Sequence, residues 1–238
     1  MIGKGKSISH GVAALEYDLA KEINGQAVAT EIARHELYGC TGAEMVQEMK
    51  PYHIDFPNVK NNCLRFEVSP SIEESATFTD ADWAELGNDF MQRMGLANHQ
   101  YIIIRHSGTE SKKEQAHLHI LANRVSLSGE LYRDNWIGKK ATEAANAIAK
   151  ERNFVQSQDI GKVNKAEIKE AMDGVLKKMQ GFDFTKFKEE LGKRGFKVRE
   201  ARASTGKLNG YYVTARSGTE YKACLLYTSP SPRDGLLS

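Results

Sequence analysis

The sequence predicts an α+β fold: a central antiparallel sheet flanked by helices, followed by a small basic α+β module. Strand-like and helix-like segments follow one another in mixed order, without the regular βαβ repetition of a parallel sheet. Residues 100–106 form the most apolar short run and residues 117–126 a second one, so these segments are expected to pair at the centre of the sheet. With 238 residues, 40% hydrophobic and 27% charged, the composition is that of a globular protein.

The first half of the chain supplies further strands and helices. Strands are expected at residues 1–9, 28–37 and 63–69, helices at 12–22, 41–49 and 79–94, and loops at 51–62 and 70–76. The last of these strands alternates apolar and polar residues, which is typical of a half-buried strand. Thr41 is the expected N-cap of one helix, and Thr79 with Asp82 forms a capping-box pattern at the start of another. Gly95 is expected to end that helix.

The second half follows the same mixed order. After a turn at Gly129, helices are expected at residues 139–152, 166–179 and 184–192, and strands at 196–201 and 210–215. The first of these helices is rich in Ala, and the other two are amphipathic. Residues 153–163 have the character of a linker. The sequence therefore predicts one domain over residues 1–153 and a second, incomplete module over 164–223.

The second module is locally basic, although the whole chain carries a net charge of only +2. Its bases between residues 193 and 216 are Lys193, Arg194, Lys197, Arg199, Arg202, Lys207 and Arg216. A single acid, Glu200, opposes them. Such a run suits contacts with a phosphate backbone, and a solvated surface with no ligand is an equally frequent explanation.

The last residues, 224–238, do not resemble a natural protein segment. The run from Cys224 to Asp234 resembles a translated sequencing adapter, the transposase end sequence of short-read library preparation. We therefore expect the natural chain to continue differently after Ala223, and these residues are left out of the fold prediction.

Composition also indicates the compartment. No apolar run approaches the roughly 18–20 residues of a membrane span. No apolar segment comes after the N-terminal lysines as it would in a secretory signal. The three cysteines have neither metal-type spacing nor the even number of a disulfide framework. We expect a cytoplasmic protein without a membrane partner.

Three histidines lie where the two apolar strands are expected to meet. His117 and His119 stand two residues apart, so a strand presents both imidazoles on one face. His106 ends the preceding strand and supplies a third imidazole. Neutral imidazole is a good ligand for divalent metals, and three protein ligands leave positions open for a substrate. The pattern predicts a metal site open at the surface of a sheet.

These residues, together with the N-terminus, resemble a known family. Tyr17 comes soon after the first expected strand, and Asn123 and Arg124 come soon after the histidines. This order is similar to that of the relaxase/mobilisation nuclease family of mobilisable plasmids and transposons, part of the HUH endonuclease superfamily. The likeness covers residues 1–153. The second module resembles the next segment of these proteins only unspecifically.

The resemblance implies a reaction and roles for particular residues. The tyrosine, here Tyr17, attacks the scissile phosphate of one DNA strand at an origin of transfer, forms a 5′-phosphotyrosyl intermediate and leaves a 3′-OH that can be rejoined. The metal is held by His106, His117 and His119. The family uses magnesium or manganese, whereas all-imidazole ligation also suits zinc or nickel.

The sequence departs from the family pattern at one position. The family's acid comes two residues after the first histidine, where this chain has Gly108. Glu110 or Glu114, in the longer loop after His106, is the candidate to orient an imidazole, with Glu110 preferred.

The resemblance also implies a nucleic-acid surface and partners. The candidate DNA contacts are basic: Lys112, Lys113, Arg124, Lys139, Lys140, Arg199, Arg202 and Lys207. The implied ligand is single-stranded DNA at an origin of transfer, with accessory mobilisation proteins and a coupling protein as further partners. Two alternatives stay open: a replication initiator or transposase of the same superfamily, and a non-catalytic single-strand DNA-binding module.

Overall fold

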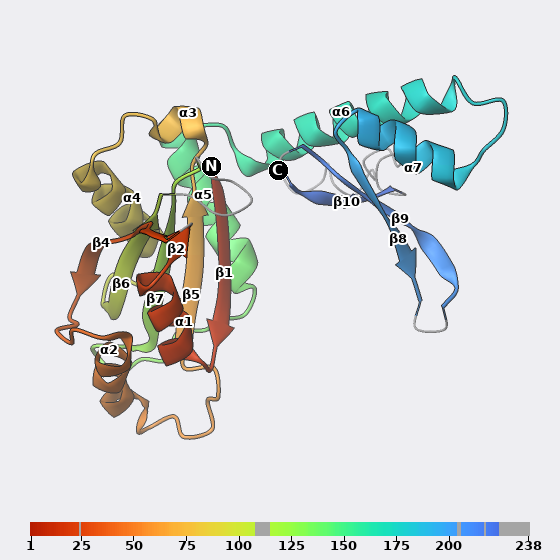
Figure 1. Cartoon of the computed structure of the whole chain (residues 1–238). Coiled ribbons are helices and arrows are strands. Elements are labelled where there is room, and N and C mark those ends of the chain that lie inside the picture. Colours follow the sequence, from red (N-terminus) through yellow and green to blue (C-terminus); the bar gives the residue numbers. More distant parts are fainter. Residues whose placement is uncertain (24, 108–114, 204–205, 217, 224–238) are drawn as a thin grey trace, which may run out of the picture. The chain divides into compact units, whose positions relative to one another are not determined.

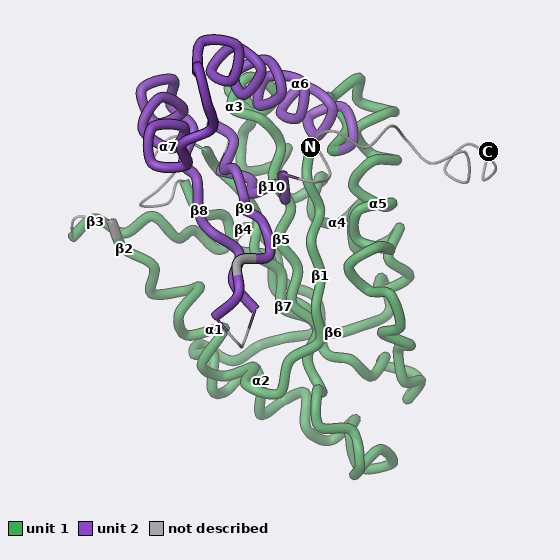
Figure 2. Tube along the Cα trace, turned by 90° about the vertical axis from the view of Figure 1, so that its right-hand side faces the viewer, with its two compact units in different colours: residues 1–157 green, residues 158–238 purple. Residues whose placement is uncertain are grey.

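A computed structural model describes residues 1–23, 25–107, 115–203, 206–216 and 218–223 (Figure 1). The adapter-like residues 224–238 lie outside this described part. The chain divides into two compact units, residues 1–157 and 158–238, which are coloured separately in Figure 2. No helix within the described ranges is long and apolar enough to cross a membrane.

The first unit is built on a five-stranded sheet. Its strands lie in the order β1 (Ile2–Ile8), β5 (Cys63–Ser69), β7 (His117–Ser126), β6 (His99–His106) and β4 (Ala29–His35). Every neighbouring pair is antiparallel, which confirms the predicted fold class. The two apolar strands β6 and β7 pair with each other in the interior of the sheet, as their composition predicts. The short hairpin of β2 (Glu22–Ile23) and β3 (Gln26–Ala27) lies outside this sheet and was not predicted.

Helices cover both faces of this sheet (Figure 1). One face packs against α4 (Asp80–Arg93) and α5 (Ile137–Glu151), and the other against α1 (Gly11–Leu19) and α2 (Gly42–Met49). Alternation along β6 divides the two cores: Ile103 belongs to the first, and Ile102 and Ile104 belong to the second.

Helix capping agrees closely with the sequence. Thr41 and Thr79 each form a complete capping box, and Gly95 comes just after α4 with a φ of 71°. Two short helices lie where loops were expected: the 3₁₀ helix η1 (Lys50–His53) and α3 (Ile72–Ser75). Single turns of this length carry too few residues to show a helical period.

Glycine in β1 permits α5 to approach the sheet closely. A Cβ on Gly3 would overlap the carbonyl oxygen of Ala141 and lie 2.6 Å from the Cβ of Ala145. Gly5 is similarly crowded by Phe66 and Ala141. Residues 3 and 5 therefore face the α5 core, and residues 4 and 6 of the same strand face the opposite side.

The second unit has its own small core. It contains α6 (Ser157–Leu176), α7 (Phe184–Lys193) and a three-stranded antiparallel sheet of β8 (Lys197–Arg202), β9 (Leu208–Thr214) and β10 (Glu220–Lys222). Apolar residues of both helices pack against Val198 and Val213. Helix α6 begins at Ser157, so residues 157–163, expected to be linker, are helical; Ile160 and Val163 are the apolar residues of that segment and give only a weak periodic signal.

Candidate metal and nucleophile site

Strand pairing brings the three histidines together. His106 lies directly opposite His117 in the β6–β7 register, and His119 lies opposite Ile104. All three side chains are on the face that α1 covers, because they share the alternation of Ile102 and Ile104. One ring nitrogen from each histidine lies within 4.8 Å of the others, so the cluster predicted from the His-x-His pattern is present.

Hydrogen bonds set the proton positions on two of these rings. His106 Nε2 donates to the backbone carbonyl of Asp18 at 2.7 Å, and His117 Nδ1 donates to the carbonyl of Gln115 at 3.1 Å. In the neutral rings, the other nitrogen of each is left with a lone pair. This is the arrangement in which metal-binding histidines are commonly held, with one N–H donated to a carbonyl oxygen.

The third ring lacks such an anchor. His119 Nδ1 is buried and has no hydrogen-bond partner among the described residues. Its Nε2 faces the Nε2 of His117 at 3.1 Å. Two ligands that each bind a metal at about 2.1 Å lie about 3.0–3.4 Å apart, so this spacing fits a shared cation. The donor set therefore fits a divalent metal held by the three imidazoles.

Burial favours the neutral, metal-binding form of His106 and His119. Burial lowers the pKa of His119 to about 2, and the neighbouring histidines and Arg65 act in the same direction. Burial also lowers the pKa of His106. Both rings are therefore neutral near pH 7, and their lone pairs are free of protons.

Helix α1 carries the candidate nucleophile beside this cluster. Tyr17 is 56% exposed, whereas the next residue, Asp18, is 2% exposed and bonds to His106 through its carbonyl. Lys21, one turn further on, donates its ammonium to the Tyr17 hydroxyl at 2.7 Å and lies 4.8 Å from the ring centroid. The Tyr17 side chain is thus largely exposed, and its phenol oxygen is in contact with a positive charge.

The side chain of Asp18 also lies close to the histidine cluster. Its carboxylate accepts hydrogen bonds from the Nε of Arg65 at 3.0 Å and from a terminal guanidinium nitrogen of the same residue. One carboxylate oxygen lies 3.9 Å from the orphaned Nδ1 of His119. Burial raises the pKa of Asp18, and the Arg65 guanidinium opposes that shift.

Sequence reasoning missed Asp18, Arg65 and Lys21. The residues it preferred for the acid's role, Glu110 and Glu114, lie outside the described residues, as do Lys112 and Lys113. Two local features of the sequence could have indicated these residues. Asp18 comes directly after Tyr17 on a short helix. Arg65 is a charged residue in strand β5, on the same face of the sheet as the histidines.

The other candidate DNA contacts of the first unit lie away from the histidines. Arg124 points to the opposite face of β7 and is held by Asp134, at 2.6 Å, and by two backbone carbonyls. At the start of α5, Lys139 pairs with Glu143 and Lys140 donates to a carbonyl at 2.7 Å. Their roles in DNA binding stay predictions.

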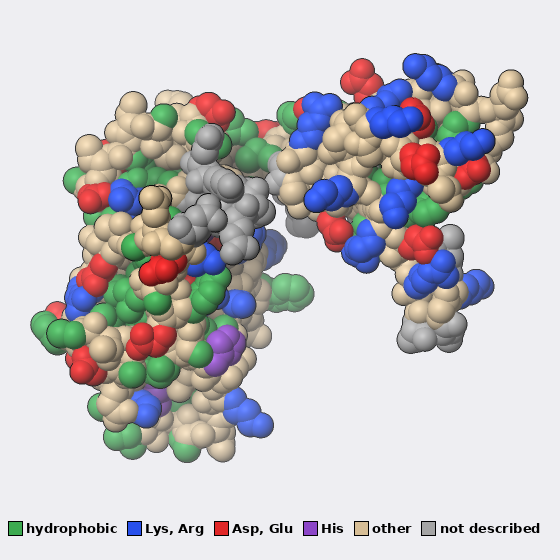
Figure 3. All heavy atoms as spheres, viewed as in Figure 1, with side chains coloured by type: hydrophobic (Ala, Val, Ile, Leu, Met, Phe, Trp, Pro, Cys, Tyr) green, Lys and Arg blue, Asp and Glu red, His purple; other side chains and the backbone are tan. Residues whose placement is uncertain are grey.

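The second unit carries mixed charges on its surface. In Figure 3, lysine and arginine side chains are interspersed with acids over α6, α7 and the sheet of this unit. Arg199 pairs with Glu220 and stacks 4.5 Å from the ring centroid of Tyr212, and Arg202 pairs with Glu200. Lys207 is exposed. DNA binding by Arg199, Arg202 and Lys207 also stays a prediction.

Comparison with known proteins identifies the class of protein. The family model for the nuclease domain of MobA/VirD2-like relaxases matches residues 17–154, more than half of the chain and nearly all of the histidine-bearing unit. The chain belongs to this relaxase family, as its motifs predict. No curated protein matches the sequence well enough to be reported as a relative.

Two solved structures share a limited likeness with the chain. One is the conjugative relaxase TrwC in complex with oriT DNA in a metal-bound form, at 12% identity and a TM-score of 0.39. The other is the metal-free form of the same complex, at 10% identity and a TM-score of 0.39. Each match covers 87% of this chain and 74% of the other.

Proposed function

We propose that this chain is a metal-dependent DNA relaxase that nicks and rejoins one strand at an origin of transfer through a phosphotyrosyl intermediate on Tyr17. The observation that carries this proposal is the hydrogen bond between His106 and the backbone of Asp18, which links the helix of Tyr17 to a cluster of three imidazoles. Membership of the relaxase family supports the same function.

In the proposed reaction, the phenol oxygen of Tyr17 attacks phosphorus. A bond forms between that oxygen and phosphorus while the bond from phosphorus to the 3′ oxygen breaks, and the phenol proton passes to solvent as the 3′ oxygen is protonated. The protein keeps a 5′-phosphotyrosyl bond, so the 3′-OH rejoins the strand by the reverse reaction without ATP. His106, His117 and His119 would hold a divalent cation, which would supply positive charge at the phosphate oxygens.

The neighbouring residues prepare Tyr17 for this step. The ammonium of Lys21 stabilises negative charge that develops on the phenol oxygen. The ion pair of Asp18 with Arg65 fixes α1 against β5, so Asp18 and Arg65 are positioning residues. Because Asp18 also faces His119, the pair holds the nucleophile's helix and the imidazoles in one arrangement.

The experiment that tests this function is a covalent trapping assay. The full chain is incubated with manganese and a supercoiled plasmid carrying the DNA that flanks its gene, then denatured and separated by electrophoresis. We expect a denaturation-resistant protein–DNA adduct that a chelator abolishes and that Tyr17→Phe lacks. Tyr38→Phe is the matched control, because Tyr38 is exposed as well but hydrogen-bonds to Glu36 in another part of the unit. An equal adduct yield in Tyr17→Phe would remove Tyr17 from the proposed role.

The same assay addresses the remaining parts of the proposal. We propose a cytoplasmic enzyme that acts on single-stranded DNA at an origin of transfer and works with accessory mobilisation proteins and a coupling protein. Mapping the nick by primer extension places it in the flanking DNA. A nick at a replication origin would assign the chain to replication initiation instead.

A further inference from the structure

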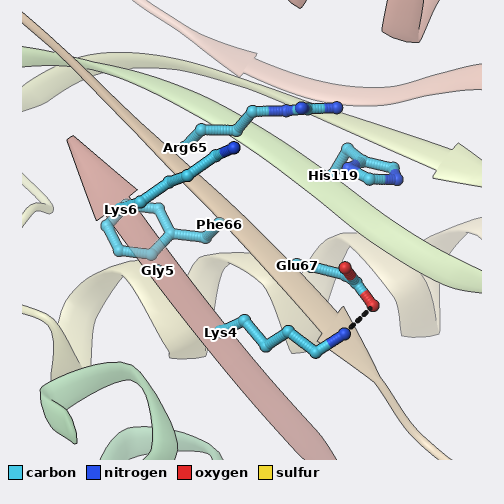
Figure 4. Close-up of a pocket in the computed structure, with 7 residues that line it drawn as sticks. All are labelled: Lys4, Gly5, Lys6, Arg65, Phe66, Glu67 and His119. Atoms are coloured by element: carbon cyan, nitrogen blue, oxygen red, sulfur yellow. Dashed lines mark hydrogen bonds and ion pairs between the residues drawn. The ribbon is translucent and has the colours of Figure 1, made fainter. Parts of the chain in front are cut away.

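A pocket of about 240 Å³ opens between β1 and β5, beside the histidine cluster (Figure 4). It is lined by Lys4, Gly5, Lys6, Arg65, Phe66, Glu67 and His119. His119 belongs both to this pocket and to the cluster, so the pocket is continuous with the proposed metal site. The proposed reaction does not use its two lysines.

Of the positively charged side chains that line the pocket, Lys4 and Arg65 have ion-pair partners among the described residues and Lys6 has none. Lys4 lies opposite Glu67 in the β1–β5 register and contacts its carboxylate at 3.0 Å, the contact drawn as a dashed line in Figure 4. Arg65 is occupied by Asp18. Lys6 is exposed and forms no ion pair or hydrogen bond through its side chain with any described residue. Lys6 therefore carries the uncompensated positive charge of this pocket.

The position of Lys6 points to an anionic ligand. Lys6 lies directly opposite Arg65 across the strand pair, and like charges in directly opposed positions destabilise a sheet. In Figure 4 both side chains extend toward the side of the pocket where His119 lies. An anion bound there would offset the repulsion between the two cations, and it would lie next to the proposed metal site.

We propose that this pocket is a subsite for a backbone phosphate adjacent to the scissile one, with Lys6 as its principal contact. The inference rests on the proposed function, because that function makes a DNA strand the ligand at His119. Lys6 positions the strand without taking part in bond exchange. The pair of Lys4 with Glu67 forms the neutral edge of the subsite and contributes little affinity.

The test measures binding alone, so that it is independent of cleavage. The affinity of a fluorescein-labelled 25-nucleotide single-stranded DNA of mixed sequence is measured by fluorescence anisotropy over a range of salt concentrations. The full chain carries Tyr17→Phe and the buffer contains a chelator, so no adduct forms. Lys6→Gln is expected to weaken binding about fivefold at 50 mM salt and to lower the salt slope by about 0.7, the value for one lost phosphate contact.

Two matched variants separate a direct contact from a change in net charge. Lys150→Gln removes one positive charge from an exposed position on α5, across the sheet from the pocket, and is expected to weaken binding less than twofold. The double variant Lys4→Gln with Glu67→Gln leaves net charge unchanged and is also expected to remain within twofold. A thermal melt for each variant shows that the fold is retained.

The outcomes are decisive in both directions. If Lys6→Gln weakens binding no more than Lys150→Gln does, or leaves the salt slope unchanged, the pocket is not a phosphate subsite. If the Lys4/Glu67 double variant loses as much affinity as Lys6→Gln, the assignment to Lys6 is wrong. Failure of the unmodified chain to form an adduct in the trapping assay would overturn the nuclease function, whereas a selective effect of Lys6→Gln would still establish the anion subsite.

Discussion

The two faces of the five-stranded sheet are made by alternate residues of the same strands, yet their contents differ. The face under α4 and α5 is apolar over most of its length, and the two arginines on it, Arg105 and Arg124, are paired with Asp80 and Asp134. The face under α1 and α2 is apolar at one end and polar at the other, where the three histidines, Arg65 and Glu67 lie. Burial of apolar surface on the first face stabilises the fold and leaves the polar end of the second free to bind charged ligands. Substitutions on the two faces should therefore separate stability from chemistry.

The largest effects are expected at His119 and Ile120, which are adjacent in β7 and therefore lie on opposite faces of the sheet. His119→Ala should reduce adduct formation by about a hundredfold or more, because it removes one of the three imidazoles proposed to hold a divalent cation at the phosphate. Ile120→Ala, on the α4/α5 face, should lower the free energy of unfolding by about 2–5 kcal/mol and leave adduct yield unchanged below the melting temperature. Trapping assays and urea denaturation of both variants check this. If His119→Ala unfolds the protein, or Ile120→Ala abolishes the adduct, then the claim that one face provides stability and the other provides the chemistry is wrong.

A second prediction concerns the contact between β1 and α5. Gly3→Val should destabilise the first unit by about 2–3 kcal/mol, because a Cβ at this position overlaps the backbone of Ala141 and two further methyl groups add to the strain. Thermal melting followed by circular dichroism measures the loss. Gly129→Ala is a useful comparison, since nothing lies within 4 Å of the Cβ site and only its φ of 83° opposes the change. Equal stability of Gly3→Val and the wild type would contradict the close packing described for α5.

A third prediction tests whether α1 and α2 exclude solvent from the apolar end of the sheet face that they cover. Burial raises the pKa of the Cys63 thiol to about 11, whereas Cys40 is exposed. At pH 8, iodoacetamide should modify Cys40 within minutes and leave Cys63 unmodified until the protein unfolds, as peptide mass spectrometry can detect.

The raised pKa of Cys63 also has a consequence for stability. Above about pH 9 the thiol ionises in the unfolded chain but stays protonated in the folded one, so the free energy of unfolding falls as the pH rises. A Cys63→Ala variant should lose this part of the pH dependence. Rapid modification of Cys63 in the native protein would show that this end of the face is open.

The smallest effect is expected at the edge of the lysine pocket. Glu67→Gln frees Lys4 from its ion pair, so single-stranded DNA should bind about threefold to fivefold more tightly, with a salt slope larger by about 0.7. Anisotropy titrations in the Tyr17→Phe background measure both quantities. Weaker binding by Glu67→Gln would mean that the carboxylate contributes to the site in another way, as a ligand or as a hydrogen-bond acceptor.

Much of this organisation was predictable because it depends on local periodicity. Period-two alternation places His117 and His119 on one face, and the pairing of two apolar strands brings His106 opposite. Thr41 and Thr79 indicate helix starts through hydrogen bonds to residues three positions away. These features need no knowledge of the tertiary structure.

The rest depends on contacts between segments distant in sequence. The role of Asp18 becomes visible only when α1 packs on the sheet, because its partners Arg65 and His106 are 47 and 88 residues away. Strand β10 has three residues, too few to show alternation, and forms by pairing with β9. The polar N-terminal turns of α6 are helical although they carry few apolar residues.

The covalent bond proposed between Tyr17 and DNA can be located by identifying the modified residue itself. After reaction with plasmid DNA and exhaustive nuclease digestion, trypsin should release residues 7–21 as one peptide that contains Tyr17. We expect mass spectrometry to find a nucleotide linked through a 5′-phosphate to Tyr17 in this peptide, and chelation of the metal before reaction to remove the modified form. A nucleotide attached to any other residue, or an unmodified peptide from a reaction that nicks the plasmid, would contradict the proposed role of Tyr17.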